Sequence, residues 1–228
     1  MKAYGANDLA EFAVRMEELR ATLDPPTADG AYIAYTDGAC FGNPSGPGGW
    51  AAAVFLDGGI PFWHLFGHLS STSNNRAEAL GVLGALEWVP ARSRLAIRSD
   101  SELTLRLLEG RYKVKANADV WELIQRRRAE KQLDLSYQWV RGHAGDPLNE
   151  LADRLSKLGA LNGGIEDLGA LEEVSPPPEH AQLAGLVPKG DWEREFLSSV
   201  AQQLGRGRQL SPKQQAIVDR IRARGAAG

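Results

Sequence analysis

A helical pattern opens the chain. Apolar side chains recur at three- and four-residue spacing between residues 7 and 23, at Leu9, Phe12, Met16, Leu19 and Leu23. This spacing predicts an amphipathic helix with Asn7 or Asp8 as its N-terminal cap. Pro25 and Pro26 follow. Because proline cannot continue a helix, we expect the helix to end before them.

From residue 31 the pattern changes to short apolar runs that are typical of strands. The runs AYIAYT (31–36), WAAAVF (50–55) and WHLFGHL (63–69) are separated by turn residues, including the Asp-Gly-Gly sequence at 57–59. Consecutive strands joined by short turns pair in antiparallel fashion. We therefore predict an antiparallel meander of three strands.

The middle of the chain alternates helices with strands. We predict helices over residues 74–89, 101–110, 118–131 and 146–161, and strands over residues 94–100 and 135–140. The last of these helices opens with Asp146 as its cap and Pro147 at its first position. A strand–helix–strand order implies a crossover connection, so the strands on either side of a helix are predicted to pair in parallel.

The C-terminal third differs from the middle in composition and charge. Residues 161–205 carry eight acidic and two basic residues and include a Ser-Pro-Pro-Pro run, whereas residues 206–228 carry six basic residues and one acidic residue. Polar, Pro-rich composition predicts a linker. Farther on, Ser211-Pro212-Lys213-Gln214 matches a capping box at the start of a helix.

These patterns divide the chain into four parts. We predict an N-terminal helical extension (1–30), a central domain (31–160), a Pro/Gly/acidic linker (161–190) and a small, helical, basic C-terminal extension (191–228).

Composition narrows the class of protein. The single cysteine, Cys40, excludes an intramolecular disulfide and favours a reducing compartment. No apolar run approaches the roughly 20 residues that cross a bilayer, and the start lacks the features of a signal peptide. We expect a cytoplasmic protein without a membrane partner, and a monomer.

Four acidic residues occupy positions that suit a shared site. Asp37 ends the first predicted strand, Asp100 closes the fourth, and Glu78 and Asp153 lie on helices. Neighbouring strands lie roughly 5 Å apart, so parallel pairing would make Asp37 and Asp100 adjacent, and two helices could bring in the others. Such carboxylates repel one another unless cations compensate. Because Mg²⁺ takes oxygen ligands, the acids indicate a site for hard divalent ions.

Each acid also has a purely structural interpretation. Asp37 starts an ordinary Asp-Gly turn pair, Glu78 completes the N-x-x-E pattern of a capping box, and the Asp100-Ser101 pair would cap the helix that follows. Asp153 lies off the apolar stripe of its helix and would then be a solvated surface acid. Taken singly, the acids leave both interpretations open.

The segments around these acids decide between the two. TDGACFGNPSGPGGW, NNRAE, SDSE and WVRGHAGDPLNELAD, in this order, resemble type 1 ribonuclease H over about residues 31–160. The resemblance implies an α/β fold with a five-stranded mixed sheet, three antiparallel strands and then two parallel ones, flanked by helices. It also implies an endoribonuclease that hydrolyses the RNA strand of RNA–DNA hybrids with two Mg²⁺ ions, for which Mn²⁺ can substitute. The products would carry 5′-phosphate and 3′-hydroxyl ends.

The resemblance assigns roles residue by residue. The family's catalytic, metal-binding acids correspond to Asp37, Glu78, Asp100 and Asp153. The family histidine that assists proton movement or product departure corresponds to His143, whose ordinary pKa suits that role near neutral pH. Hybrid recognition requires contacts to 2′-hydroxyls in the minor groove. The matching positions are Gly38, Cys40, Asn43, Asn74 and Asn75.

Three of these residues can also be considered on physical grounds alone. Asn74 and Asn75 would equally serve as helix caps. Gly38 is expected to let the backbone pass close to the nucleic acid, because a side chain there would obstruct the minor groove.

The chain departs from the family in two places, at residue 102 and at the basic insertion. Glu102 stands where the family has glutamine and would add negative charge near the substrate if it pointed inward. The basic, Trp-rich insertion of many bacterial relatives is replaced by GRYKVKANADVW, in which a reduced version is expected from Tyr112, Lys113 and Lys115. The basic run at 126–131 is either a further contact or a solvated helix end. The basic tail at 206–228 is a candidate for compensating contact with nucleic acid.

Two other functions remain open on the sequence alone. One is a hybrid-binding module of the same fold with little catalysis, which the presence of all four acids disfavours. The other is a metal nuclease of the same fold superfamily that acts on DNA junctions, and the NNRAE and GHAG segments favour the hybrid-specific branch over it.

Overall fold

A computed structural model describes residues 7–59, 61–142, 144–162, 192–193, 196–197, 199–200 and 210–225. The chain divides into two compact units, of which one holds most of the sheet with helices α1 to α5, and the other holds residues 55–62 and helix α7. Each unit is described by itself.

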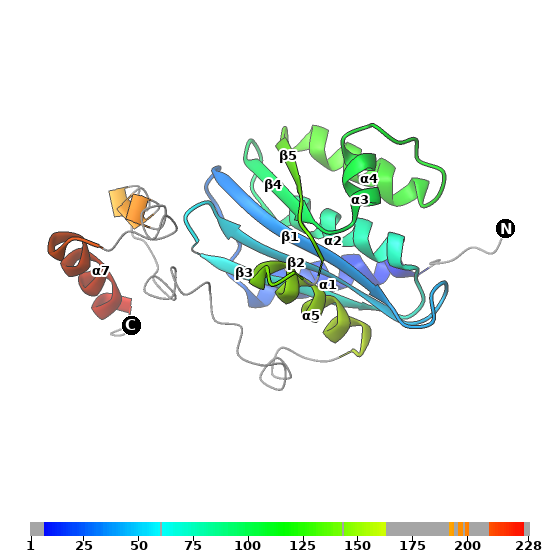
Figure 1. Cartoon of the computed structure of the whole chain (residues 1–228), viewed down its shortest axis with the longest axis horizontal. Helices are drawn as coiled ribbons and strands as arrows, with labels where there is room; N and C mark the ends of the chain where they lie inside the picture. The colour runs from blue at the N-terminus through cyan, green and yellow to red at the C-terminus, as the bar shows by residue number, and fades with distance from the viewer. Residues whose placement is uncertain are drawn as a thin grey trace. The chain divides into compact units, whose positions relative to one another are not determined.

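The first unit is built on a five-stranded mixed sheet. Its strands are β1 (Ala31–Cys40), β2 (Gly48–Leu56), β3 (Phe62–Leu69), β4 (Arg94–Ser99) and β5 (Asp134–Trp139), and their spatial order is β3-β2-β1-β4-β5. β1 pairs in parallel with β4, and β4 in parallel with β5. β1 therefore lies at the centre of the sheet (Figure 1). The predicted fold class is confirmed.

The first strand extends farther than its apolar run. β1 continues to Cys40, so Asp37 lies within the strand, and its predicted position at the strand end is wrong. The turn begins only after Cys40, where the Phe41 N–H donates to the Pro47 carbonyl and Gly42 has a φ of 78°. Backbone pairing, which does not need an apolar side chain, carries the strand past Asp37.

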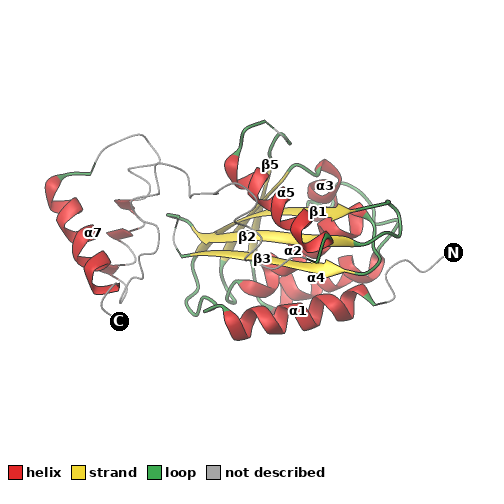
Figure 2. Cartoon of the chain, turned by 90° about the horizontal axis from the view of Figure 1, so that it is seen from below, coloured by secondary structure: helices red, strands yellow, loops and turns green. Residues whose placement is uncertain are grey.

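Helices cover both faces of this sheet. They are α1 (Asp8–Thr22), α2 (Asn74–Trp88), α3 (Glu102–Leu108), α4 (Ala118–Glu130) and α5 (Pro147–Ala160). Trp50 of β2 contacts Phe12 of α1 and lies against Gly84 of α2, whereas the next residue along the strand, Gly49, lies against α5 at Ser156. Successive strand residues point to opposite faces, so α1 and α2 share one face and α5 covers the other, as Figure 2 shows.

Helix α1 is part of the first unit's core. Asp8, buried at 1% exposure, accepts two hydrogen bonds from Arg76 of α2, and Arg20 at the other end of α1 bonds to Glu87 near the end of α2. The two helices therefore run side by side in the same direction. Asp8 is thus an ion-pair partner, while Asn7 takes the cap position without a side-chain cap bond.

Helix α2 is buried on nearly every side, because the sheet, α1 and α4 surround it. The basic end of α4 contributes to its C-terminus, where the Lys131 ammonium donates to the carbonyls of Leu86, Glu87 and Val89. Arg127 bonds to Glu87 and Glu130. These two members of the basic run at 126–131 therefore serve the fold.

The second unit contains α7 (Pro212–Gly225) and a small apolar cluster. The predicted capping box is present, since the Ser211 hydroxyl accepts from the Gln214 N–H and the Gln214 side chain accepts from the Ser211 N–H. The cluster consists of Leu197, Val200, Val218 and Ile221. Nearly all of the predicted linker 161–190 lies outside the described residues, and the proposed domain boundaries stay predictions.

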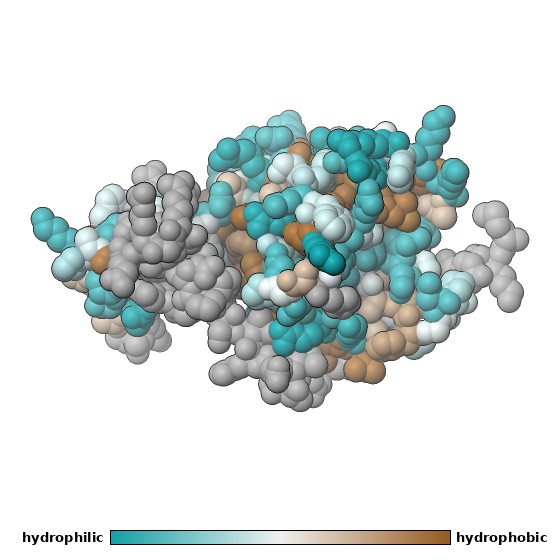
Figure 3. Space-filling model, in the orientation of Figure 1, coloured by the Kyte–Doolittle hydropathy of each residue, from teal (hydrophilic) through white to brown (hydrophobic). Residues whose placement is uncertain are grey.

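The face of the molecule shown in Figure 3 is mainly hydrophilic, with scattered apolar side chains. Among the described residues, no helix combines the length and apolar character that crossing a bilayer requires.

Candidate active site

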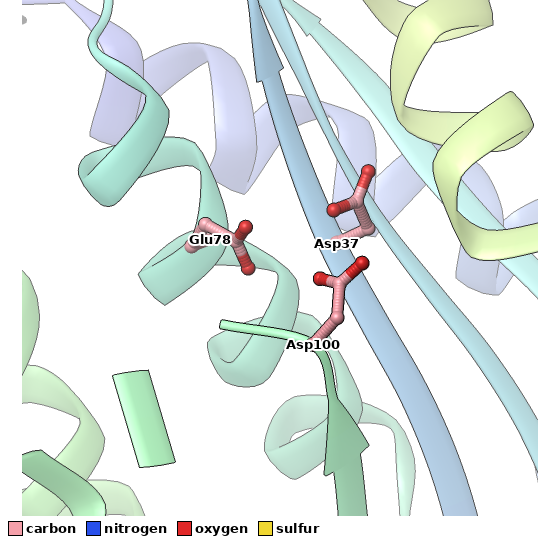
Figure 4. Close-up of side chains that lie close together, drawn as sticks. All are labelled: Asp37, Glu78 and Asp100. Atoms are coloured by element: carbon pink, nitrogen blue, oxygen red, sulfur yellow. The ribbon is translucent and has the colours of Figure 1, made fainter. Parts of the chain in front are cut away.

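Three acidic side chains from three elements meet at the carboxyl end of β4. Asp37 lies in β1, Glu78 in the second turn of α2, and Asp100 directly after β4. One carboxylate oxygen from each lies within 4.8 Å of the others. Figure 4 shows the three carboxylates turned toward one another. The expected adjacency of Asp37 and Asp100 is confirmed, and it follows from the parallel pairing of β1 with β4.

A glycine lets the third acid approach. A Cβ atom added at Gly38 would lie 2.1 Å from the backbone nitrogen of Glu78 and 2.4 Å from the carbonyl carbon of Ala77. No real side chain fits at such distances, so only glycine lets α2 pass this close to β1. Gly38 thus brings Glu78 to Asp37, a packing role that the sequence interpretation, which placed Gly38 at the minor groove, had missed.

Burial and mutual repulsion raise the proton affinity of two of the acids. Burial raises the pKa of Glu78 well above its usual range, and the charges of Asp37 and Asp100 raise it further. Burial also raises the pKa of Asp37; a hydrogen bond from Ser156 opposes this, while Asp100 and Asp153 add to it. Within the part of the chain that the structure describes, no positive charge lowers the pKa of either carboxylate.

One carboxylate oxygen of Glu78, Oε2, is buried and has no hydrogen-bond partner among the described residues. The cap of α2 is Ser73, which makes no side-chain cap bond, so the capping-box interpretation of Glu78 is wrong. An unpaired buried carboxylate oxygen beside two further acids fits a divalent cation, because Mg²⁺ takes carboxylate oxygens and its charge lowers the pKa values of neighbouring acids.

Helix α5 supplies two partners of the acids that sequence reasoning missed. The Asn149 side chain donates to Oδ2 of Asp100 over 3.1 Å, and the Ser156 hydroxyl donates to Oδ2 of Asp37. Of the Asp100-Ser101 pair, Ser101 caps α3 by accepting from the Thr104 N–H, and Asp100 does not serve as the cap. The signal for both partners was their three-, four- and seven-residue spacing around Asp153, which places all of them on one helix face.

The fourth predicted acid lies apart from the other three. Asp153 is absent from the close group, and its Oδ2 atom accepts from the Lys157 ammonium over 2.7 Å. Its charge nevertheless reaches Asp37, whose pKa it raises. The structure therefore brings together three of the four predicted ligands.

The predicted substrate-binding residues lie around the acids. Asn43 accepts from the Asn74 N–H over 3.2 Å, so its side chain links the β1–β2 turn to the start of α2. Cys40 faces the carbonyls of Gly46 and Thr72. Asn74 and Asn75 are exposed. His143 lies outside the described residues.

The departures from the family lie outside the close group of acids. Glu102 has a side chain 65% exposed, pairs with Arg106 one turn along α3 and does not belong to the close group. Lys113 and Lys115 line a hollow of about 590 Å³ together with Asn75 and Tyr112. This hollow begins one turn before Glu78 on α2.

The comparisons with known proteins agree with this geometry. The RNase H family model matches residues 29–161. Proteins named Ribonuclease H from Methylococcus capsulatus and Polynucleobacter asymbioticus are 39% and 40% identical to the chain over 150 and 156 residues. The matches cover 59% and 62% of this chain and 89% and 94% of theirs.

Two solved structures share the fold. The N-terminal RNase H domain of a Mycobacterium tuberculosis protein, solved as a fusion with maltose-binding protein, has a TM-score of 0.52 at 24% identity and covers 59% of this chain and 96% of that one. LC11-RNase H1, isolated from compost and solved in complex with an RNA/DNA hybrid, has a TM-score of 0.51 at 26% identity, with 57% and 97% covered. The chain belongs to the RNase H family of ribonucleases.

Proposed function

We propose that this chain hydrolyses the RNA strand of RNA–DNA hybrids as an endoribonuclease. The observation that carries the proposal is the convergence of Asp37, Glu78 and Asp100 in a chain of the RNase H family. A family member of the same fold was solved with an RNA/DNA hybrid bound, which supports the choice of substrate.

The acids are proposed to hold two Mg²⁺ ions, for which Mn²⁺ can substitute. When bound, such ions activate a water and offset the charge that develops on the scissile phosphate. Asp37, Glu78 and Asp100 provide the inner carboxylates, and Asp153 joins them once its oxygen is released from Lys157. Ser156 and Asn149 hold Asp37 and Asp100 in fixed orientations.

Cleavage is proposed to leave 5′-phosphate and 3′-hydroxyl ends. A water attacks phosphorus and the bond to the 3′ oxygen breaks, so the phosphate stays on the downstream fragment. His143, which precedes α5 in the sequence, is proposed to move a proton or to assist product departure, since a histidine changes its charge near neutral pH.

Hybrid recognition is proposed to combine minor-groove contacts with cationic ones. Asn43, Asn74 and Asn75 offer amide groups that suit 2′-hydroxyls, which are both donors and acceptors. The hollow with Lys113 and Lys115 lies next to them and suits the phosphate backbone.

The second unit is proposed as an additional contact with nucleic acid. Trp192 is 57% exposed and stacks on Phe196 with ring centroids 5.6 Å apart. Lys213 and Arg220 are exposed on α7. Exposed aromatic rings together with cations suit single-stranded nucleic acid. Deleting 206–228 would strip Val218 and Ile221 from the apolar cluster, so charge-neutralising variants are the cleaner test.

The proposal is tested with a pair of neighbouring acids. Asp100→Asn removes a charge from the close group, whereas Glu102→Gln changes an acid two residues away that pairs with Arg106. Both variants and the wild type are assayed on a labelled RNA–DNA hybrid with Mg²⁺ or with chelator, and hybrid binding is measured in parallel. We expect Asp100→Asn to bind the hybrid but lose cleavage, and Glu102→Gln to cleave like the wild type.

Two outcomes would redirect the interpretation. Wild-type binding without cleavage in any divalent metal would indicate a hybrid-binding module. Cleavage of junction DNA in preference to the hybrid would indicate a nuclease of the related branch. Equal loss of cleavage in both variants would contradict the assignment of Asp100 to the site.

A further inference from the structure

A row of polar side chains on α5 faces the catalytic side of the sheet. Each of them contacts a residue of the sheet or one directly after it. Asp146 at the cap accepts from Tyr35 of β1, and Asn149 in the first turn donates to Asp100 after β4. Ser156, near the end of the helix, donates to Asp37 of β1. The latter two hold the acids Asp100 and Asp37. Asp146 instead contacts Tyr35, which neither the family match nor the proposed chemistry assigns to a role.

The contact of Asp146 lies next to the acids in the sheet. Tyr35 of β1 is paired with Arg98 of β4 in the parallel register. Asp37 and Asp100 lie two residues farther along the same strands. Residues two apart in a strand point to the same face, so the Tyr35–Arg98 pair lies directly behind the acid pair, under α5.

The three side chains form a directed chain of hydrogen bonds. Arg98 donates from Nη1 to the Tyr35 hydroxyl over 2.8 Å, and its guanidinium lies 5.3 Å from the centre of the Tyr35 ring. The hydroxyl in turn donates to Oδ2 of Asp146 over 3.3 Å. A tyrosine hydroxyl has one proton, and arginine only donates, so the bond from Arg98 leaves that proton for Asp146.

The two oxygens of Asp146 hold different elements. Oδ1 accepts from the backbone N–H groups of Leu148 and Asn149 and so caps α5. Oδ2 accepts from Tyr35 of β1. The carboxylate thereby fastens the first turn of α5 to the sheet, and that turn carries Asn149, the partner of Asp100.

We propose that Arg98, Tyr35 and Asp146 are positioning residues that hold Asn149 on Asp100 and thereby orient this metal-binding carboxylate. The expected effect on kcat rests on the proposed function. The expected effect on the position of Asn149 does not. Tyr35 is 4% exposed, and phenylalanine would occupy the same space without the hydroxyl. Tyr35→Phe therefore removes the hydrogen bond to Asp146 and keeps the buried ring.

The test compares Tyr35→Phe with Tyr32→Phe. Tyr32 is a buried tyrosine of the same strand whose hydroxyl donates to the Ala28 carbonyl over 2.7 Å. Tyr32 lies three residues before Tyr35. Because successive strand residues point to opposite faces, Tyr32 lies on the face away from α5. We expect Tyr35→Phe to lower kcat about 10-fold with little change in KM, as misplacement of a reacting group does, and Tyr32→Phe to leave kcat unchanged.

A double mutant shows whether Tyr35 acts through Asn149. If it does, Asn149→Ala combined with Tyr35→Phe cleaves no more slowly than Asn149→Ala alone, because the same contact is lost only once. Effects that multiply, or a Tyr35→Phe variant within about 2-fold of the wild type, would overturn the proposal.

A structural measurement keeps the test independent of activity. In ¹⁵N-labelled protein without metal, the Asn149 side-chain amide resonance should move in Tyr35→Phe and stay in place in Tyr32→Phe. An Asn149 resonance that is unchanged in both variants would overturn the positioning role of Tyr35, even if the wild type cleaves hybrids. A resonance that moves as expected would support it even if the wild type cleaves none.

Discussion

Replacing Gly38 with alanine tests how closely α2 must approach β1. The new Cβ atom would lie 2.1 Å from the Glu78 nitrogen, whereas ordinary contact begins at 3.4 Å, so the two backbones must separate by about 1.3 Å. The atoms in the way are backbone atoms of Ala77 and Glu78, which cannot rotate aside. Glu78 then moves out of a group whose ligand oxygens all lie within 4.8 Å.

Two magnitudes follow from this displacement. Misplacement of a reacting group by roughly 1 Å costs on the order of 100-fold in rate, so kcat of Gly38→Ala on an RNA–DNA hybrid should fall by about that factor. Overpacking of a core costs about 1–3 kcal/mol, so the free energy of unfolding in urea should fall by that amount. Affinity for Mg²⁺, measured by calorimetry, should fall as well.

Gly110→Ala is the matched control. Gly110 has a φ of 71° and open space around its Cβ position, so alanine there strains the backbone without moving α2. It should lose about 1–2 kcal/mol of stability and keep its kcat at a temperature where both variants are folded.

The outcomes separate a packing role from contact with nucleic acid. If Gly38 serves only to let nucleic acid approach, alanine would raise KM with an unchanged free energy of unfolding. A Gly38→Ala variant with wild-type kcat, Mg²⁺ affinity and stability would refute the packing argument.

Three further predictions concern charge. In chelator, Glu78→Gln should melt at a higher temperature than the wild type at mildly alkaline pH. Because burial raises the folded-state pKa of Glu78, its stability contribution is lost as pH rises, so the difference should vanish in acid, and a melting profile that does not depend on pH would contradict this. Asp8→Ala leaves the buried Arg76 with Asp119 as its remaining acidic partner among the described residues. The free energy of unfolding in urea should fall by about 3 kcal/mol. A fall of less than about 1 kcal/mol, as expected of an exposed pair, would refute this prediction. Lys213→Gln with Arg220→Gln should flatten the dependence of log KM on log salt by up to about 1.8, and an unchanged slope would remove the second unit from nucleic-acid contact.

Much of the fold was predictable from local signals. Asp146 and Pro147 mark the start of α5, and Ser211 and Gln214 mark that of α7, because capping depends on residues that are close in sequence. The parallel pairing of β1 with β4 followed from the order of elements, and it placed Asp37 beside Asp100.

Features that depend on distant contacts were not predictable. Asp8 was a candidate cap, but it pairs with an arginine 68 residues away, which no local pattern reveals. Gly38 was interpreted by its resemblance to the family, whereas the backbone of α2 explains it physically. The bond between Asp153 and Lys157 was visible as four-residue spacing and was overlooked because the acid already had a catalytic interpretation.

The central claim is that three carboxylates on this fold make a metal-dependent nuclease for the RNA strand of hybrids. The most direct measurement is cleavage of a hybrid whose RNA and DNA strands carry different labels, by the wild-type protein with Mg²⁺ and with chelator, followed by analysis of the fragment ends. We predict Mg²⁺-dependent fragments of the RNA strand alone, each new end carrying a 5′-phosphate or a 3′-hydroxyl. Cleavage that persists in chelator, or that falls on the DNA strand, would contradict it.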